Sequence, residues 1–199
     1  MTPARQLKIA AVQLDSEEII LRRIIDAHGE ATLGGILTLL SIPCLIPSMG
    51  IGWVLALGIF AIGAAMLAGS DKVHLPKRVE SLPIKKRTAQ KLLIGLAKLY
   101  VRAGRIAKPR WHAMSSKEAQ RWLSLVVLSM GFIIFLPIPG GNTLPAIALV
   151  LLGPGLVFRD GFMIAGSIVA AVFATVLTAG AVWAVGWGLL VTATKYWPF

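Results

Sequence analysis

A short polar segment inside an otherwise apolar run is the first candidate for chemistry. It reads PIPGGNTLP from Pro137 to Pro145 and contains no charge. Proline lacks an amide donor and glycine tolerates turns, so this segment interrupts any helix. If the run lies in a membrane, such backbone must be buried in protein or line a wet cavity, because hydrocarbon cannot satisfy its polar groups. We therefore treat the following residues as a candidate contact site for a polar group or an ion: Pro137, Pro139, Gly141, Asn142, Thr143 and Pro145.

Asn142 and Thr143 also suit a local structural role. Their side chains can accept hydrogen bonds from the first amides of a helix that follows them. The two roles are compatible, so helix capping stays open beside ligand contact.

Charged residues return directly after this run, at Arg159-Asp160-Gly161. Arg159 could hold a lipid phosphate or an anionic sugar lipid. The alternative is a cytoplasmic turn whose cation helps to set the topology. Asp26 and Glu30, which precede the first apolar run, are candidates for a structural ion pair with Arg159 or with basic residues of the central connector.

The first apolar run carries a similar break, which contains Pro43, Pro47 and Gly50. The break leaves two arms of about 16–18 residues, or about 24–27 Å as helix, slightly less than the roughly 30 Å of a bilayer core. Two short crossings and a re-entrant hairpin both fit these lengths. We treat this break as the counterpart of the second one.

A shift of 92 residues aligns the two apolar runs without gaps, and it places Pro47 on Pro139 and Gly63 on Gly155. Internal repeats with interrupted helices are typical of transporter folds, and their breaks often mark a binding site. Basic residues flank both runs, which predicts two copies with the same orientation.

Residues for catalysis or metal binding form no recognisable set. His28, His74 and His112 are scattered among polar segments, without a second ligand at metal spacing. Cys44 is the only cysteine, so neither a disulfide within the chain nor a cysteine-based metal site can form. The apolar runs hold no acidic residue, which argues against proton-coupled transport and acid/base catalysis in the membrane. We expect no enzyme activity, no cofactor and no metal.

Composition places the chain in a membrane. Of its 199 residues, 56% are hydrophobic and 15% are charged, whereas soluble domains carry about 25% charged residues. Three charge-free runs, 31–69, 122–158 and 161–194, each exceed the roughly 20 residues that cross a bilayer. These values argue against a soluble single domain, a disordered chain and a nucleic-acid-binding module.

Basic residues cluster between the apolar runs. The net charge is +11, and 14 of the 20 lysines and arginines lie between Lys72 and Arg121. The positive-inside rule then places the N-terminus and the connector in the cytoplasm. Anionic lipid headgroups are the expected partner, and nucleic acid is not.

The expected fold is an all-α single membrane domain. Asp15 and Glu18 form a capping box that predicts an N-terminal helix. The last run predicts one crossing from Gly161 to about Trp183 with an aromatic interfacial tail, and two very short crossings are the alternative. The predicted parts are a cytoplasmic N-terminal helix (1–30), a first broken hairpin (31–70), a basic cytoplasmic connector (71–121), a second broken hairpin (122–160), and a C-terminal membrane helix with its tail (161–199).

The connector predicts a helix over 88–107. Leu92, Leu96 and Leu99 share one face at helical spacing, next to a stripe of lysines and arginines. Such a basic amphipathic helix suits the cytoplasmic headgroup layer. It equally suits a helix that packs on the membrane domain and leaves its basic side in water.

This order of features resembles a known family. A TLG motif at 32–34 precedes the proline-broken run, a basic linker follows, LPIPGGNTLP occupies 136–145, and RDG occupies 159–161. The arrangement is similar to that of the bacterial exopolysaccharide synthesis family ExoD. The resemblance implies a multi-pass inner-membrane protein that is linked to exopolysaccharide production.

The leading hypothesis is a non-enzymatic membrane protein in exopolysaccharide synthesis, export or its regulation. It would act through exopolysaccharide-synthesis membrane components, or on a lipid-linked or anionic substrate. The alternative is a small transporter or lipid-flipping protein that uses both breaks. A homodimer through small residues is also predicted, with Gly58, Gly63, Ala64 and Gly153 as the proposed contacts.

Overall fold

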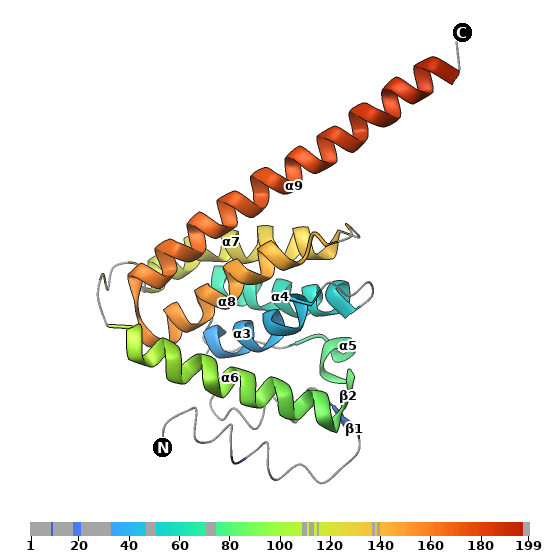
Figure 1. Cartoon of the computed structure of the whole chain (residues 1–199). Coiled ribbons are helices and arrows are strands. Elements are labelled where there is room, and N and C mark those ends of the chain that lie inside the picture. Colours follow the sequence, from blue (N-terminus) through green and yellow to red (C-terminus); the bar gives the residue numbers. More distant parts are fainter. Residues whose placement is uncertain are drawn as a thin grey trace.

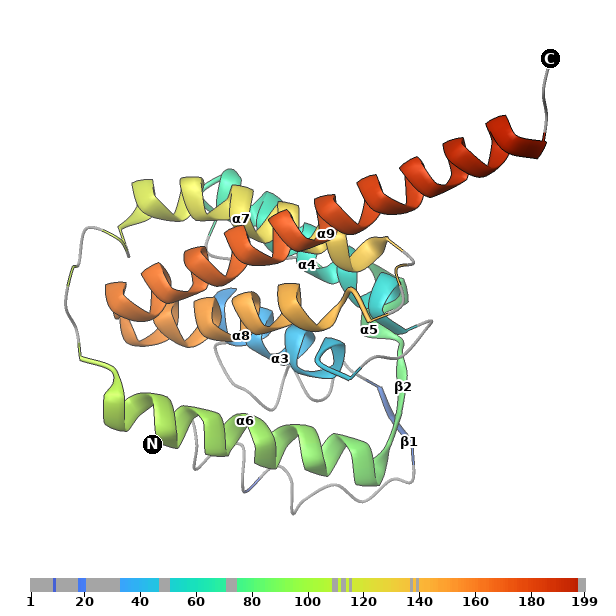
Figure 2. The same ribbon diagram turned by 45° about the horizontal axis from the view of Figure 1, so that its top comes forward.

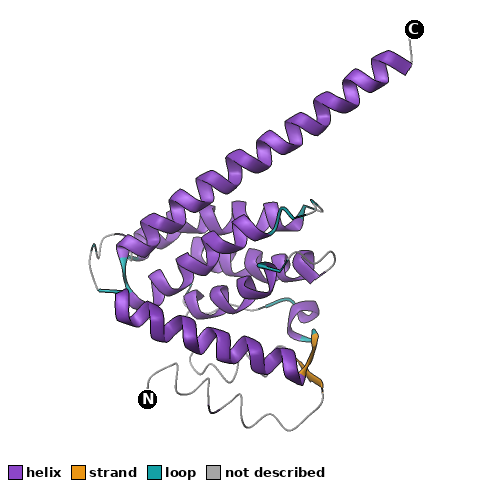
Figure 3. Ribbon diagram, in the orientation of Figure 1, coloured by secondary structure: helices purple, strands orange, loops and turns teal. Residues whose placement is uncertain are grey.

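The structure is a computed structural model, and it describes residues 9, 18–20, 33–46, 51–70, 75–108, 111, 114, 116–136, 138 and 140–196. The described part is almost entirely helical (Figure 3). The elements in chain order are β1 (Glu18–Ile20), α3 (Leu33–Cys44), α4 (Ile51–Leu67), α5 (Lys77–Glu80), β2 (Pro83–Lys85), α6 (Lys86–Ile106), α7 (Lys117–Phe135), α8 (Thr143–Phe158) and α9 (Gly161–Tyr196).

The prediction of an N-terminal helix is wrong at residues 18–20. These residues form β1, which pairs antiparallel with β2, and Glu18 lies opposite Lys85. Ile19 and Ile20 are β-branched and favour extended backbone, and the pairing with β2 outweighs the local capping box. The rest of the predicted N-terminal helix lies outside the described residues.

Helices α3, α4, α7 and α8 form a bundle (Figure 1). Helix α4 packs most extensively against α7, and α3 packs against α8. Both predicted breaks therefore separate two helices, and each helix contacts a helix of the other apolar run. The core between them is aliphatic, and its fully buried side chains include Leu37, Leu40, Ile59, Ile62, Met130 and Leu149.

Glycines allow α3 and α8 to come very close. A Cβ atom on Gly34 would lie 2.5 Å from the carbonyl oxygen of Gly153, and a Cβ on Gly153 would overlap the Thr38 side chain. Gly58 and Gly63 likewise face Leu40 and Leu128 at short range. Four small residues were predicted to join two copies of the chain. Three of them, Gly58, Gly63 and Gly153, pack instead against neighbouring helices of the same chain.

Helix α9 is continuous over 36 residues and leaves the bundle in its second half (Figure 1). Because the helix is unbroken, the alternative of two very short crossings is wrong, whereas the predicted limit of the crossing near Trp183 stays a prediction. By length and hydropathy, α9 and α7 could each cross a membrane. Helices α3, α4 and α8 have 12, 17 and 16 residues, fewer than the roughly 20 residues that a crossing needs.

The predicted connector helix is confirmed as α6. Its buried face packs on α3 and α8, which corresponds to the second of the two predicted arrangements, a helix packed on the rest of the domain. Leu92 and Leu96 are buried as expected, and Leu99 is half-buried. The remaining buried residues of α6 are Ala89, Leu93, Ala97, Tyr100 and Ala103.

Substituting Gly34 with alanine tests the close approach of α3 and α8. The new methyl group meets the backbone of Gly153, so we expect Gly34→Ala to lower the free energy of unfolding by about 1–3 kcal/mol. The matched control is Gly166→Ala in α9, where nothing lies within 4 Å, and alanine should stabilise that helix by about 0.5–1 kcal/mol. Thermal unfolding of the purified protein in detergent measures both, and equal effects of the two substitutions would contradict the packing.

Candidate functional site

The helices that follow the two breaks, α4 and α8, begin next to each other at one end of the bundle. Figure 1 shows both helices in the bundle. Gly52 lies in the first turn of α4, directly after the first break, and Asn142 lies at the start of α8, directly after the second. A Cβ atom on Gly52 would stand 2.6 Å from Nδ2 of Asn142 and 3.7 Å from a methyl group of Ile134. Two segments that are distant in sequence thus form a single location, where the N-terminal ends of two helices adjoin.

Asn142 occupies the N-cap position of α8 without capping it through its side chain. Its backbone carbonyl accepts from the Ala146 amide at 3.0 Å. Its Oδ1 atom is buried and has no hydrogen-bond partner among the described residues. The predicted capping by the Asn142 side chain is therefore wrong, because the side chain turns toward Gly52 of α4 instead. A buried acceptor without a donor is costly, so this atom suits a bound donor.

The neighbours of Asn142 play structural parts. Thr143 is the first residue of α8. Pro145 is the third and is buried, which the first turn tolerates because its amides have no partners within the helix. Gly141 donates its amide to Ile138 at 3.0 Å and closes the turn that leads into α8. Of the other predicted break residues, Pro43 lies in the last turn of α3, and the following fall outside the described residues: Pro47, Gly50, Pro137 and Pro139.

The Arg159-Asp160-Gly161 motif lies at the opposite end of the bundle and forms the turn between α8 and α9. Arg159 is exposed and adopts a left-handed conformation with φ of 53°. Asp160 is fully buried. Its carboxylate accepts from the backbone amide of Phe162 at 2.9 Å, which caps α9, and from that of Lys108 at 3.1 Å. The two predicted groups of site residues are therefore not brought together. Asp26 and Glu30, the predicted partners of Arg159, lie outside the described residues.

A polar contact that sequence analysis missed joins α6 to α3. The Tyr100 hydroxyl is hydrogen-bonded to Thr38, and burial raises the pKa of Tyr100 well above its usual range. The Tyr100 ring also packs edge-on against Phe158, with 6.0 Å between ring centroids. A lone tyrosine in an amphipathic helix carries no sequence signal for these contacts. Together with the bond from Lys108 to Asp160, they hold the connector against the bundle.

The remaining candidates for chemistry are not assembled into a site. Cys44 is buried at the end of α3, near the Leu40 carbonyl. His28, His74 and His112 lie outside the described residues. Within the described ranges, no group of three histidine, cysteine or acidic residues could hold a metal ion.

Comparison with known proteins decides the family. The family model for exopolysaccharide synthesis, ExoD, matches residues 4–180, which cover both breaks and the RDG turn. The chain belongs to the ExoD family. Membership implies involvement in exopolysaccharide synthesis, and the resemblance expected from the sequence motifs is confirmed.

Two curated proteins are similar to this chain. Protein ExoD of Rhizobium meliloti is 32% identical over 154 residues, which cover 74% of this chain and 64% of the relative. An uncharacterised protein of Synechocystis sp. is 29% identical over 160 residues, which cover 79% of this chain and 76% of the relative. No solved structure matches significantly.

The carboxylate of Asp160 is open to a direct test. We expect Asp160→Ala to lower the free energy of unfolding by about 1–3 kcal/mol, because two partly buried amides lose their charged acceptor. Hydrogen–deuterium exchange should accelerate at the amides of Lys108 and Phe162. The control is Asp160→Asn, which keeps one acceptor oxygen and should have a smaller effect. Unchanged protection of Lys108 in Asp160→Ala would show that this carboxylate does not hold the connector.

A double-mutant cycle tests the meeting of the two breaks. In the wild type, Gly52→Ala pushes a methyl group toward Asn142, and we expect it to cost about 1 kcal/mol or more. In an Asn142→Ala background that side chain is gone, so the same substitution should cost clearly less. Chemical denaturation gives the coupling energy of the two substitutions. If their effects on the free energy of unfolding are strictly additive, Gly52 and Asn142 do not interact.

Proposed function

We propose that this protein is a bacterial inner-membrane protein that takes part in exopolysaccharide synthesis, export or its regulation without catalysing a reaction itself. Membership of the ExoD family supports the role. The apolar helices α7 and α9 support a membrane location. The cluster of basic residues in the connector supports a cytoplasmic position for residues 71–121.

We further propose that the two broken-helix units are copies of one repeat. A shift of 92 residues moves the first residue of α4, Ile51, onto Thr143, the first residue of α8. It moves the last residue of α3, Cys44, to within one residue of the end of α7. Exchanging the units also exchanges the two most extensive packing pairs between them, α4 with α7 and α8 with α3. The pattern fits a pseudo-two-fold relation between the two units, which would place both breaks at the same end of the bundle.

The observation that carries a ligand-contact role is the buried Oδ1 atom of Asn142 at this meeting of breaks. A carbonyl oxygen accepts hydrogen bonds, so it suits a donor such as a sugar hydroxyl. A lipid-linked sugar combines such hydroxyls with an acyl tail that an apolar bundle accommodates. We propose this class of molecule as the ligand, held by Asn142 beside Gly52.

The alternative is a small transporter or a lipid-flipping protein that uses the same location. Adjoining N-terminal ends of two interrupted helices favour it, because transporter sites are built in this way. It differs from the first proposal in one measurable respect: the purified chain in proteoliposomes would move a lipid-linked sugar across the bilayer. Partners in the membrane, including exopolysaccharide-synthesis components or a second copy of the chain, belong to the first proposal and would co-purify from mild detergent.

Complementation tests the proposed function. In a bacterium that lacks the gene for this chain, we expect the wild type to restore exopolysaccharide and Asn142→Ala to restore about fivefold less. That factor corresponds to one lost hydrogen bond of about 1 kcal/mol. The control is Ser129→Ala, which removes an exposed hydroxyl of α7 that is bonded to the Val126 carbonyl of its own helix. Membrane levels of each variant are compared by immunoblot.

Two results would contradict the proposal at different levels. If deletion of the gene leaves exopolysaccharide unchanged, the assigned role is wrong. If Asn142→Ala accumulates normally and restores as much polymer as Ser129→Ala does, the role stands but the site at Asn142 is wrong.

A further inference from the structure

The described part of the connector, with helices α5 and α6, lies along one side of the bundle. Helix α6 runs alongside α3 in the opposite direction (Figures 1 and 2). Lys108, just after α6, is tied to Asp160 at the turn between α8 and α9. Toward the other end, α5 packs on α4, where a Cβ on Gly58 would lie 3.1 Å from Val79. This side of the bundle is therefore occupied by the most polar part of the described chain.

The outer face of α6 carries a row of cations. These side chains are exposed, and they are Arg87, Lys91, Lys98, Arg102 and Arg105. From the first to the last, the row spans about 27 Å at 1.5 Å per residue, which is close to the roughly 30 Å thickness of the hydrocarbon core. If the bundle stood upright in the bilayer with lipid around it, the middle of this row would face acyl chains. Cations in that position are strongly disfavoured.

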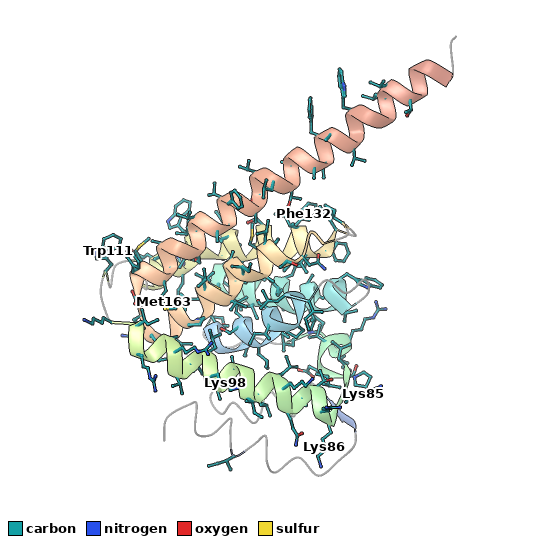
Figure 4. All side chains as sticks on the ribbon, viewed as in Figure 1. Lys85, Lys86, Lys98, Trp111, Phe132 and Met163 are labelled. Carbon is teal, nitrogen blue, oxygen red and sulfur yellow. The ribbon has the colours of Figure 1, made fainter. Side chains whose placement is uncertain are left out.

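The opposite side of the molecule is apolar. Helix α7 exposes a stripe in which Trp122 is 75% exposed and Phe132 is 57% exposed, and Phe162 of α9 is 64% exposed. Figure 4 shows Phe132 on the side of the bundle away from Lys85, Lys86 and Lys98. The other large apolar side chains exposed on α7 and the first half of α9 are Leu125, Phe135, Val169, Val172, Phe173, Val176 and Leu177.

We propose that the protein is embedded through this α7–α9 face, with α6 facing the cytoplasm. Helices α3, α4 and α8 then do not cross the bilayer, and α9 supplies the full crossing. The occupant of the α7–α9 face is the acyl region of the membrane. This orientation rests on the membrane location proposed above. Under it, both broken units enter the bilayer only part of the way and neither crosses it.

Two features favour lipid over a protein partner on this face. Beyond the bundle, every side chain of residues 179–188 is exposed, and the segment is apolar on all sides. A protein partner covers one side of a helix, whereas hydrocarbon surrounds it. Helix α7 also contacts α9, so one membrane surface can serve the exposed apolar side chains of both helices. At 36 residues, about 54 Å at 1.5 Å per residue, α9 is long enough to cross even when strongly tilted.

Single-cysteine variants of the full chain test the orientation. In a Cys44→Ala background, Ser129→Cys reports on α7 and Lys98→Cys on α6, and Thr88→Cys provides a second exposed hydroxyl position on α6 that matches Ser129. Each protein is reconstituted in vesicles of phosphatidylethanolamine and phosphatidylglycerol. The probes are a membrane-impermeant maleimide and, on separate samples labelled in detergent, an environment-sensitive fluorophore quenched by lipids with nitroxides on their acyl chains.

We expect the impermeant maleimide to label Ser129→Cys at least about tenfold more slowly than Lys98→Cys and Thr88→Cys, because a charged reagent rarely enters hydrocarbon. All three should react equally after unfolding in dodecyl sulfate. The fluorophore at position 129 should be quenched by the nitroxide lipids, and the fluorophores at 98 and 88 should not be.

Other outcomes would overturn the orientation. Slow labelling at Lys98 with strong lipid quenching would place α6 in the bilayer and the bundle upright. Slow labelling at Ser129 without lipid quenching would mean that a protein, such as a second copy, covers α7. If the chain fails to associate with vesicles and fractionates away from membranes in cells, the membrane location itself fails. That result is distinguishable from a wrong orientation of an inserted protein.

Discussion

The close approach of α3 and α8 is the contact on which the rest of the bundle depends. Gly34 and Gly153 leave no room for a side chain between the two helices. Because these helices belong to different apolar runs, their contact joins the two runs into one body. It also sets the position of α4 and α7, which follow and precede them across the breaks. The meeting of Gly52 with Asn142 is a consequence of this arrangement.

Several buried hydroxyls of the described helices are satisfied within their own helix. Thr38 and Ser41 donate to carbonyls four residues earlier in α3, each at 2.7 Å, and Ser167 donates to Ile164 at 2.7 Å. Such bonds need no partner from another helix, so an apolar interior can hold hydroxyls without cost in unmet hydrogen bonds. Asn142 departs from this pattern. The departure occurs where two helices begin side by side, which is the reason for assigning a function to that location.

Local sequence signals predicted the elements well where one mechanism dominated. Proline and glycine marked both breaks, and helices end and begin on either side of them. The amphipathic pattern of the connector predicted 88–107, and α6 occupies Lys86–Ile106. The capping box at Asp15 and Glu18 failed because β2, far along the chain, pairs with Glu18–Ile20. No local pattern reports such a partner.

The amino-acid sequence by itself determined the apolar runs, their breaks, the basic connector and the family, because each depends on composition or on motifs that are short in sequence. Only the tertiary structure decided that Asn142 turns to Gly52 instead of capping its own helix, and that Asp160 accepts a hydrogen bond from the connector. It also decided that α6, with its row of cations, packs lengthwise along the side of the bundle. The physical reason is that these features arise from packing between segments distant in the chain, where the space available to each side chain is set by its neighbours in three dimensions.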